Sequence, residues 1–138
     1  MSPLALLLNV LWIFFGGGLS ALVFWTVGGV LLAITVVGLP FSFAAFRLAR
    51  FAFVPFGQRA VPAQQMGGRR VPGTLLANIL WFVLAGVWLW LYHVVVAIGL
   101  CLTIIGIPFG IANFRLAGLA LRPLGRRVVL VEELMPRT

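Results

Sequence analysis

Few side chains in this 138-residue sequence could catalyse a reaction or bind a metal ion. The acidic residues are Glu132 and Glu133, both near the C-terminus, and the single histidine and cysteine are His93 and Cys101. The sequence therefore lacks the residues needed for a pair of catalytic carboxylates, for a nucleophilic triad or for a cluster of metal ligands. The glycines at 16–18 lie in an apolar run, without the lysine of a phosphate-binding loop. The sequence predicts a protein that is not an enzyme and that has no cofactor and no metal site.

The composition instead indicates a membrane protein. Mean hydropathy is +1.19, with 63% hydrophobic and 9% charged residues, whereas soluble domains carry about 25% charged residues. No charged side chain precedes Arg47, and none lies between Arg70 and Arg115. Each of these gaps is long enough for two helices of roughly 20 apolar residues. We therefore expect an all-α membrane protein with one hairpin of transmembrane helices within 4–39 and another within 75–107.

The chain contains two copies of one unit. Two motifs recur at offsets of 68 and 69 residues. They are Gly38-Leu39-Pro40-Phe41 with Gly106-Ile107-Pro108-Phe109, and Asn9-Val10-Leu11-Trp12 with Asn78-Ile79-Leu80-Trp81. Repetition at a fixed period indicates a structural unit that is used twice. The first repeat is assigned to 1–60, the second to 74–138, and a cytoplasmic linker to 61–73.

A proline divides each repeat. The residue before a proline is disfavoured in helical geometry, and proline itself suits the first turn of a new helix. Helix breaks are therefore expected at each proline and at the glycine two positions earlier, which gives Gly38, Pro40, Gly106 and Pro108. The segments 41–53 and 109–121 that follow are apolar but carry arginines, a pattern typical of interfacial helices.

Two pairs of polar residues also recur within the apolar segments. Asn9 corresponds to Asn78, and Thr35 corresponds to Thr103. The side-chain amides of Asn9 and Asn78 could form interhelical hydrogen bonds that fix helix packing, or they could line a pore between subunits of an oligomer. The threonines have the same two interpretations, and packing is favoured for them because a threonine can bond a carbonyl one turn back.

All 10 basic residues are arginines. Arg59, Arg126 and Arg127 form the densest expected cluster, and guanidinium groups match phosphate, so these side chains are candidates to contact anionic lipids or a soluble anion. Arginines flanking spans are also expected for topology alone, and they place both termini and the linker in the cytoplasm. The membrane accounts for the net charge of +8, so no nucleic-acid partner is expected. In the tail, 122–138, the β-branched run at 128–133 predicts a short cytoplasmic strand.

The second repeat closely resembles the YccF family of small bacterial inner-membrane proteins. The resemblance is carried by the stretch from Ile104 to Arg115 and by the stretch from Ala120 to Val129. The first repeat matches more loosely and lacks the Gly-Ile-Ala-Asn sequence that ends at Asn113. The resemblance implies a multi-pass protein of the bacterial inner membrane and supplies no catalytic residue.

Two functions are compatible with these features. Broken helices at membrane depth are typical of transport pathways, and short spans would have to enclose such a pathway between subunits. The sequence therefore favours a homo-oligomeric channel or transporter for an unidentified small solute or ion. The alternative is a non-enzymatic membrane scaffold or accessory subunit that binds anionic lipids or a partner protein. The expected partners are membrane lipids and further copies of the chain.

Overall fold

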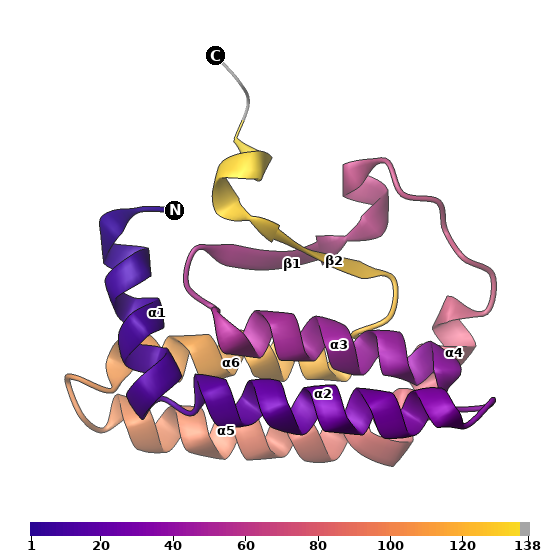
Figure 1. Cartoon of the computed structure of the whole chain (residues 1–138), viewed down its shortest axis with the longest axis horizontal. Coiled ribbons are helices and arrows are strands. Elements are labelled where there is room, and N and C mark those ends of the chain that lie inside the picture. Colours follow the sequence, from indigo (N-terminus) through magenta and orange to yellow (C-terminus); the bar gives the residue numbers. More distant parts are fainter. Residues whose placement is uncertain (136–138) are drawn as a thin grey trace.

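The computed structural model describes residues 1–135 and is mostly helical (Figure 1). The first repeat contains α1 (Pro3–Phe15), α2 (Gly18–Ile34), α3 (Leu39–Phe53) and β1 (Gln58–Pro62). The second contains α4 (Thr74–Trp81), a π-helical turn (Phe82–Gly86), α5 (Val87–Cys101), α6 (Ile107–Leu121) and β2 (Arg126–Leu130). Each strand is followed by a short 3-10 turn, at Ala63–Met66 and at Val131–Leu134.

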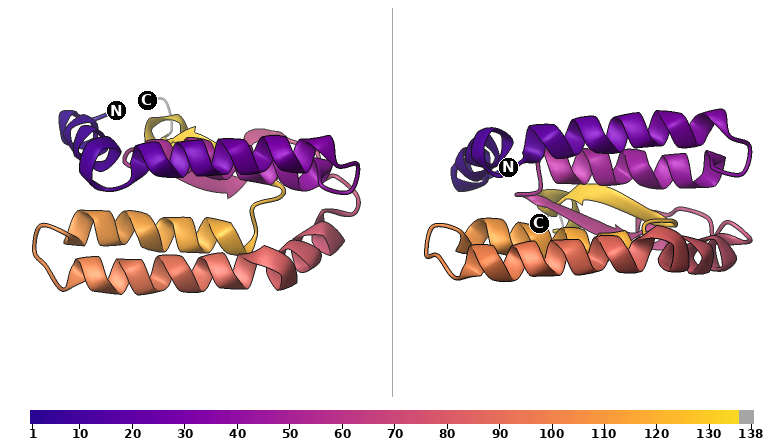
Figure 2. Two further views of the ribbon diagram at one scale, coloured as in Figure 1. Left: turned by 60° about the horizontal axis from the view of Figure 1, so that its bottom comes forward. Right: turned by 90° about the horizontal axis from the view of Figure 1, so that it is seen from below.

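The helices form two antiparallel hairpins. α2 packs along α3, and α5 packs along α6. Figure 2 shows the hairpins side by side and pointing in opposite directions, so that their turns lie at opposite ends of the molecule. α3 and α6 contact each other in the middle of this layer, which leaves α2 and α5 on its outside.

The reversal of the chain does not occur where the sequence predicted it. We expected a hairpin within 4–39, but α1 and α2 meet at a bend of 71° at the glycines between them. Gly17 has a φ of +85° there, a conformation that favours glycine. We also expected a hairpin within 75–107, but Thr74–Cys101 is one helix. Those apolar runs contain no sequence that reverses the chain, and the reversals occur at the proline breaks instead.

The number of candidate spans differs accordingly from the four that the sequence predicted. Among residues 1–135, the helix Thr74–Cys101 is long and apolar enough to cross a membrane, and α1 with α2 could form a second, bent span. The former is about 42 Å long at 1.5 Å per residue, more than the hydrocarbon core requires. α3 and α6 begin two residues earlier than expected and are the returning arms of the hairpins.

Both hairpin turns have the same hydrogen bonds. The Thr35 hydroxyl donates to the carbonyl of Leu32 (2.9 Å) and accepts from the N–H of Gly38 (3.0 Å). In the second turn, Thr103 donates to Leu100 and accepts from Gly106 at 3.0 and 3.1 Å.

The two glycines allow the main chain to approach closely at these turns. A Cβ on Gly38 would collide with the Leu32 carbonyl and the Thr35 hydroxyl, and a Cβ on Gly106 would meet the equivalent atoms. Pro40 and Pro108 then occupy the first turns of α3 and α6. The expected break residues and the two threonines therefore build one type of reverse turn twice.

A two-stranded antiparallel ribbon joins the repeats on one side of the helices (Figure 1). Gln58 pairs with Leu130, Ala60 with Val128, and Pro62 with Arg126. Because Ala60 and Val128 are equivalent positions, 68 residues apart, the local twofold axis of the ribbon also relates the two repeats. β2 begins two residues before the run 128–133 in which the sequence predicted a strand.

The N-terminus lies on the same side of the helical layer as the ribbon. The ammonium group of Met1 forms an ion pair with Glu132, which lies in the 3-10 turn after β2. The N-terminus, the segment between the repeats and the described part of the tail therefore share one face of the molecule.

Candidate functional site

Asn9 connects the first helix of its repeat to the point where the chain returns to the ribbon. Its side-chain amide donates to the carbonyl of Phe56 (2.9 Å) and accepts from the N–H of the same residue (3.0 Å). Asn9 is only 3% exposed. This reciprocal pair satisfies both main-chain groups of a buried residue, which would otherwise lose their hydrogen bonds to water without compensation.

The second repeat has the same arrangement. The amide of Asn78 donates to the Leu124 carbonyl and accepts from the Leu124 N–H, both at 3.1 Å. In each repeat a tryptophan follows the asparagine by one helical turn. The indole N–H of Trp12 on α1 donates to the carbonyl of Ala52 (2.6 Å), and the indole N–H of Trp81 on α4 donates to the carbonyl of Ala120 (2.7 Å). These carbonyls lie in the last turns of α3 and α6, where no intrahelical donor is available.

We call each Asn–Trp pair, with the main-chain groups that it binds, a return clamp. Each return clamp also touches the other repeat. The Trp12 ring lies 5.9 Å from that of Phe109, and the Trp81 ring stacks on that of Phe41 at 5.8 Å between centroids. The two repeated motifs of the sequence, Asn-x-x-Trp and Gly-x-Pro-Phe, thus meet across the boundary between the repeats. No role for the two tryptophans was expected from the sequence, although both belong to the repeated Asn-x-x-Trp motif.

Replacing Trp81 by phenylalanine is expected to lower the free energy of unfolding by about 1 kcal/mol. The phenyl ring keeps the contact with Phe41, but the carbonyl of Ala120 loses its donor. Thermal unfolding in a mild detergent, followed by circular dichroism, measures the change. Trp88→Phe is the control because Trp88 is exposed, and an equal effect in both variants would contradict the role assigned to the indole N–H.

A second buried polar pair joins α5 to α6. His93 Nδ1 lies 3.0 Å from the side-chain oxygen of Asn113, and the amide of Asn113 donates to the Phe109 carbonyl at 3.1 Å. The equivalent positions in the first repeat are Trp25 and Ala45, so this pair is specific to the second repeat. Equivalent positions in the two repeats therefore do not always make the same interhelical contact.

The three arginines of the expected cluster all lie on the two-stranded ribbon. Arg59 pairs with Val129 near one end of the ribbon, and Arg126 and Arg127 lie toward the other end. Arg126 donates to the carbonyl of Ala60 at 3.3 Å. Arg59 and Arg127 are diagonal neighbours on one face of the ribbon, but Arg59 does not line either of the cavities to which Arg126 and Arg127 contribute.

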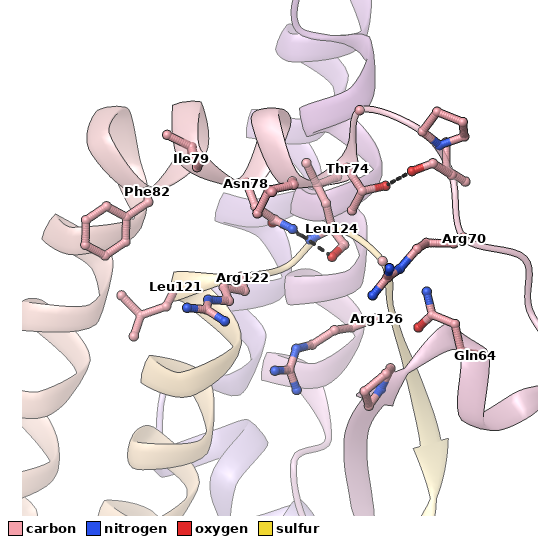
Figure 3. Close-up of a pocket in the computed structure, with 16 residues that line it drawn as sticks. Gln64, Arg70, Thr74, Asn78, Ile79, Phe82, Leu121, Arg122, Leu124 and Arg126 are labelled. Atoms are coloured by element: carbon pink, nitrogen blue, oxygen red, sulfur yellow. Dashed lines mark hydrogen bonds between the residues drawn. The ribbon is translucent and has the colours of Figure 1, made fainter.

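Arg126 and Arg127 instead join arginines from α3, the linker and the end of α6. Two cavities, of about 860 and 640 Å³, share a lining that includes residues 71–74, where the linker meets α4. The larger is lined by Arg70, Arg122 and Arg126 (Figure 3), and the smaller by Arg47, Arg69, Arg126 and Arg127. We call this pair of cavities the basic cleft. It is the candidate functional site.

Arg47 shows how the fold positions a side chain of the basic cleft. It extends from α3 and donates to the carbonyl of Pro123 at 3.3 Å. Its positive charge is also repelled by that of Arg127. A bound anion would relieve this repulsion, and guanidinium groups recognise phosphate and carboxylate oxygens well.

The equivalent position in the first repeat is not a basic cleft. Met1 lies there, with its sulfur 3.7 Å from the Asn9 amide nitrogen and its side chain against Gly57. Val54 and Gln58 occupy the positions that correspond to Arg122 and Arg126. The two repeats therefore share the return clamp but not the cleft.

Comparison with known proteins gives the family. The family described as YccF, inner membrane component domain, matches the chain twice, at residues 7–58 and 76–126. The inner membrane protein YccF of Escherichia coli K12 is 36% identical over 121 residues, which cover 84% of this chain and 82% of that protein. The protein of the same name from Shigella flexneri matches to the same extent. No solved structure matches this chain.

Proposed function

This chain belongs to the YccF family of inner membrane proteins, and on that premise we propose that it is a non-enzymatic scaffold that binds anionic lipids at the cytoplasmic face of the bacterial inner membrane. Its helical hairpins are embedded in the bilayer, and the ribbon with its arginines lies at the membrane surface. The twofold axis that relates the repeats then runs along the membrane normal.

The return clamps carry this proposal. Asn9 binds Phe56, and Asn78 binds Leu124, so each repeat begins and ends at the ribbon. A repeat that leaves and re-enters the same face keeps the N-terminus, the linker and the tail in one compartment. The arginines of the linker and the tail make that compartment the cytoplasm by the positive-inside rule.

The exposed apolar surface supports embedding of the hairpins. The turns between their arms present Val36 and Ile104, which are 86% and 88% exposed, and neighbouring Val37 and Ile105 are nearly as exposed. Burying such surface is favourable by about 25 cal/mol per Å², and soluble monomers rarely expose large contiguous apolar patches. The turns therefore suit hydrocarbon better than water.

Cysteine labelling tests this topology. In a Cys101→Ala background, Gln65→Cys in the linker is expected to react with a membrane-impermeant maleimide only when the cytoplasmic side is accessible. Val36→Cys and Ile104→Cys are expected to remain unlabelled from either side, because the turns lie in hydrocarbon. Detergent-solubilised protein is the control, in which all three cysteines should react.

Labelling of Gln65→Cys from the periplasm would contradict the proposed orientation. Labelling of one turn from the periplasm and of the other from the cytoplasm would show that the two oppositely directed hairpins cross the bilayer, and would contradict the embedded turns.

A homo-oligomeric transport pathway is the second candidate. It is favoured by the π-helical turn Phe82–Gly86 within the long apolar helix, because such turns are frequent at functional sites. Asn9 and Asn78 already bind main-chain groups of their own chain, so a polar path would have to be lined by other residues. Light scattering of the protein in nanodiscs separates the candidates, and a monomer would exclude a pathway formed between subunits.

A further inference from the structure

We propose that the larger cavity of the basic cleft is a site for one anionic phospholipid, which places its phosphate among Arg70, Arg122 and Arg126 and an acyl chain along α4. The inference rests on the proposed function and deepens it, because it replaces general attraction to anionic lipids with one defined site.

The charge around the cavity has a single sign. Figure 3 shows the three guanidinium groups around a common space, carried by the linker, the end of α6 and β2. Within residues 1–135, neither glutamate lines the cavity, and Glu132 is paired with the N-terminus. Arg126 is oriented by its bond to the Ala60 carbonyl and retains further N–H donors for a ligand. Phosphate oxygens are the natural acceptors for several convergent guanidinium groups.

The opposite wall is apolar. It is formed by Leu75, Ile79 and Phe82 on α4 and the start of the π-helical turn, and all three side chains are exposed. This wall belongs to the long apolar helix, so it continues from the cavity into the surface that faces lipid in the proposed orientation. A soluble phosphate would leave the wall uncovered, whereas a phospholipid covers it and also neutralises the arginines.

The internal repeat provides a comparison within the same molecule. Both repeats return to one face, so a topological role alone would be served by arginines spread over both. The cleft residues Arg122 and Arg126 have Val54 and Gln58 as their counterparts, and Met1 occupies the equivalent space. The cavity residues Arg122 and Arg126 are thus present in the second repeat and absent from the equivalent positions of the first, as expected if they bind one specific ligand.

The test compares two variants that lose the same charge. Arg70→Gln with Arg122→Gln removes two arginines of the cavity, whereas Arg50→Gln with Arg59→Gln removes two exposed arginines outside it. Native mass spectrometry of the full chain, titrated with phosphatidylglycerol or cardiolipin, measures lipid binding. The cavity variant is expected to lose about tenfold in affinity for the first bound lipid, and the control variant less than about threefold.

Equal losses in the two variants would overturn the site and indicate diffuse attraction. Inorganic phosphate and glycerol phosphate form the second arm. If either displaces the lipid from the wild-type protein at millimolar concentration, the assignment to a phospholipid is overturned in favour of a soluble phosphate. Cysteine labelling reports the orientation independently, so failure of the site and failure of the proposed topology are distinguishable.

Discussion

Replacing Asn9 by alanine is expected to lower the free energy of unfolding by about 2–4 kcal/mol. The substitution removes the donor and the acceptor that satisfy the carbonyl and the N–H of Phe56. Both main-chain groups are then left buried without partners, and each unsatisfied group costs about 1–3 kcal/mol. Denaturation in mixed micelles, followed by tryptophan fluorescence, measures the loss.

Two further variants make this prediction specific. Gln64→Ala removes an exposed amide and is expected to change stability by less than about 0.5 kcal/mol. Asn78→Ala should lie between the two, because Asn78 makes the same pair of bonds but is only half-buried. If Asn9→Ala behaved like Gln64→Ala, the return clamp would not hold the start and the end of the repeat together.

Several features of the fold could be predicted from local sequence. The repeat, the proline breaks and the threonines that follow α2 and α5 depend on residues within a few positions of one another. Pro40 can only occupy the first turn of a helix without disrupting it, and the hydroxyl of Thr35 reaches only nearby main-chain groups. These local rules hold whatever surrounds the chain.

The direction of the chain after each apolar helix could not be predicted in the same way. Hydropathy fixes the length of an apolar run but not where it reverses, so α1 with α2, and α4 with α5, were expected to be hairpins. The partner of Asn9 lies 47 residues away, and no local pattern indicates such a contact. The repeated Asn-x-x-Trp motif was the available signal, since both side chains lie on one helical face.

The candidate site likewise contains residues that could be identified from the sequence and residues that only the tertiary fold brings together. Sequence spacing identified Arg126 and Arg127 but grouped them with Arg59, because all three flank the expected strand and linker. Arg59 lies diagonally across the ribbon from Arg127 but outside the two cavities, and the return of α6 brings Arg122 to the same cavity as Arg126. Arg47 joins them from a helix that was expected at the membrane interface. Only the tertiary fold assembles this set.

Replacing Gly106 by alanine is expected to lower the free energy of unfolding by about 1–3 kcal/mol. Its backbone has a φ of −78°, so the cost does not come from a conformation that alanine cannot adopt. It comes from the new Cβ, which would collide with the Leu100 carbonyl and the Thr103 hydroxyl. The carbonyl is part of the last turn of α5 and cannot rotate away, so the hairpin turn must open to accept the methyl group.

Gly99 provides the matched control, seven residues earlier in the same hairpin. Nothing lies within 4 Å of a Cβ added there, and alanine is favoured over glycine within a helix by about 0.5–1 kcal/mol. Gly99→Ala should therefore be neutral or stabilising, while Gly106→Ala destabilises, and Gly38→Ala should repeat the effect in the first turn. Thermal unfolding in one detergent compares the three variants directly. Equal stability of Gly99→Ala and Gly106→Ala would mean that the close approach of main chain in the turn does not hold the two arms of the hairpin in place.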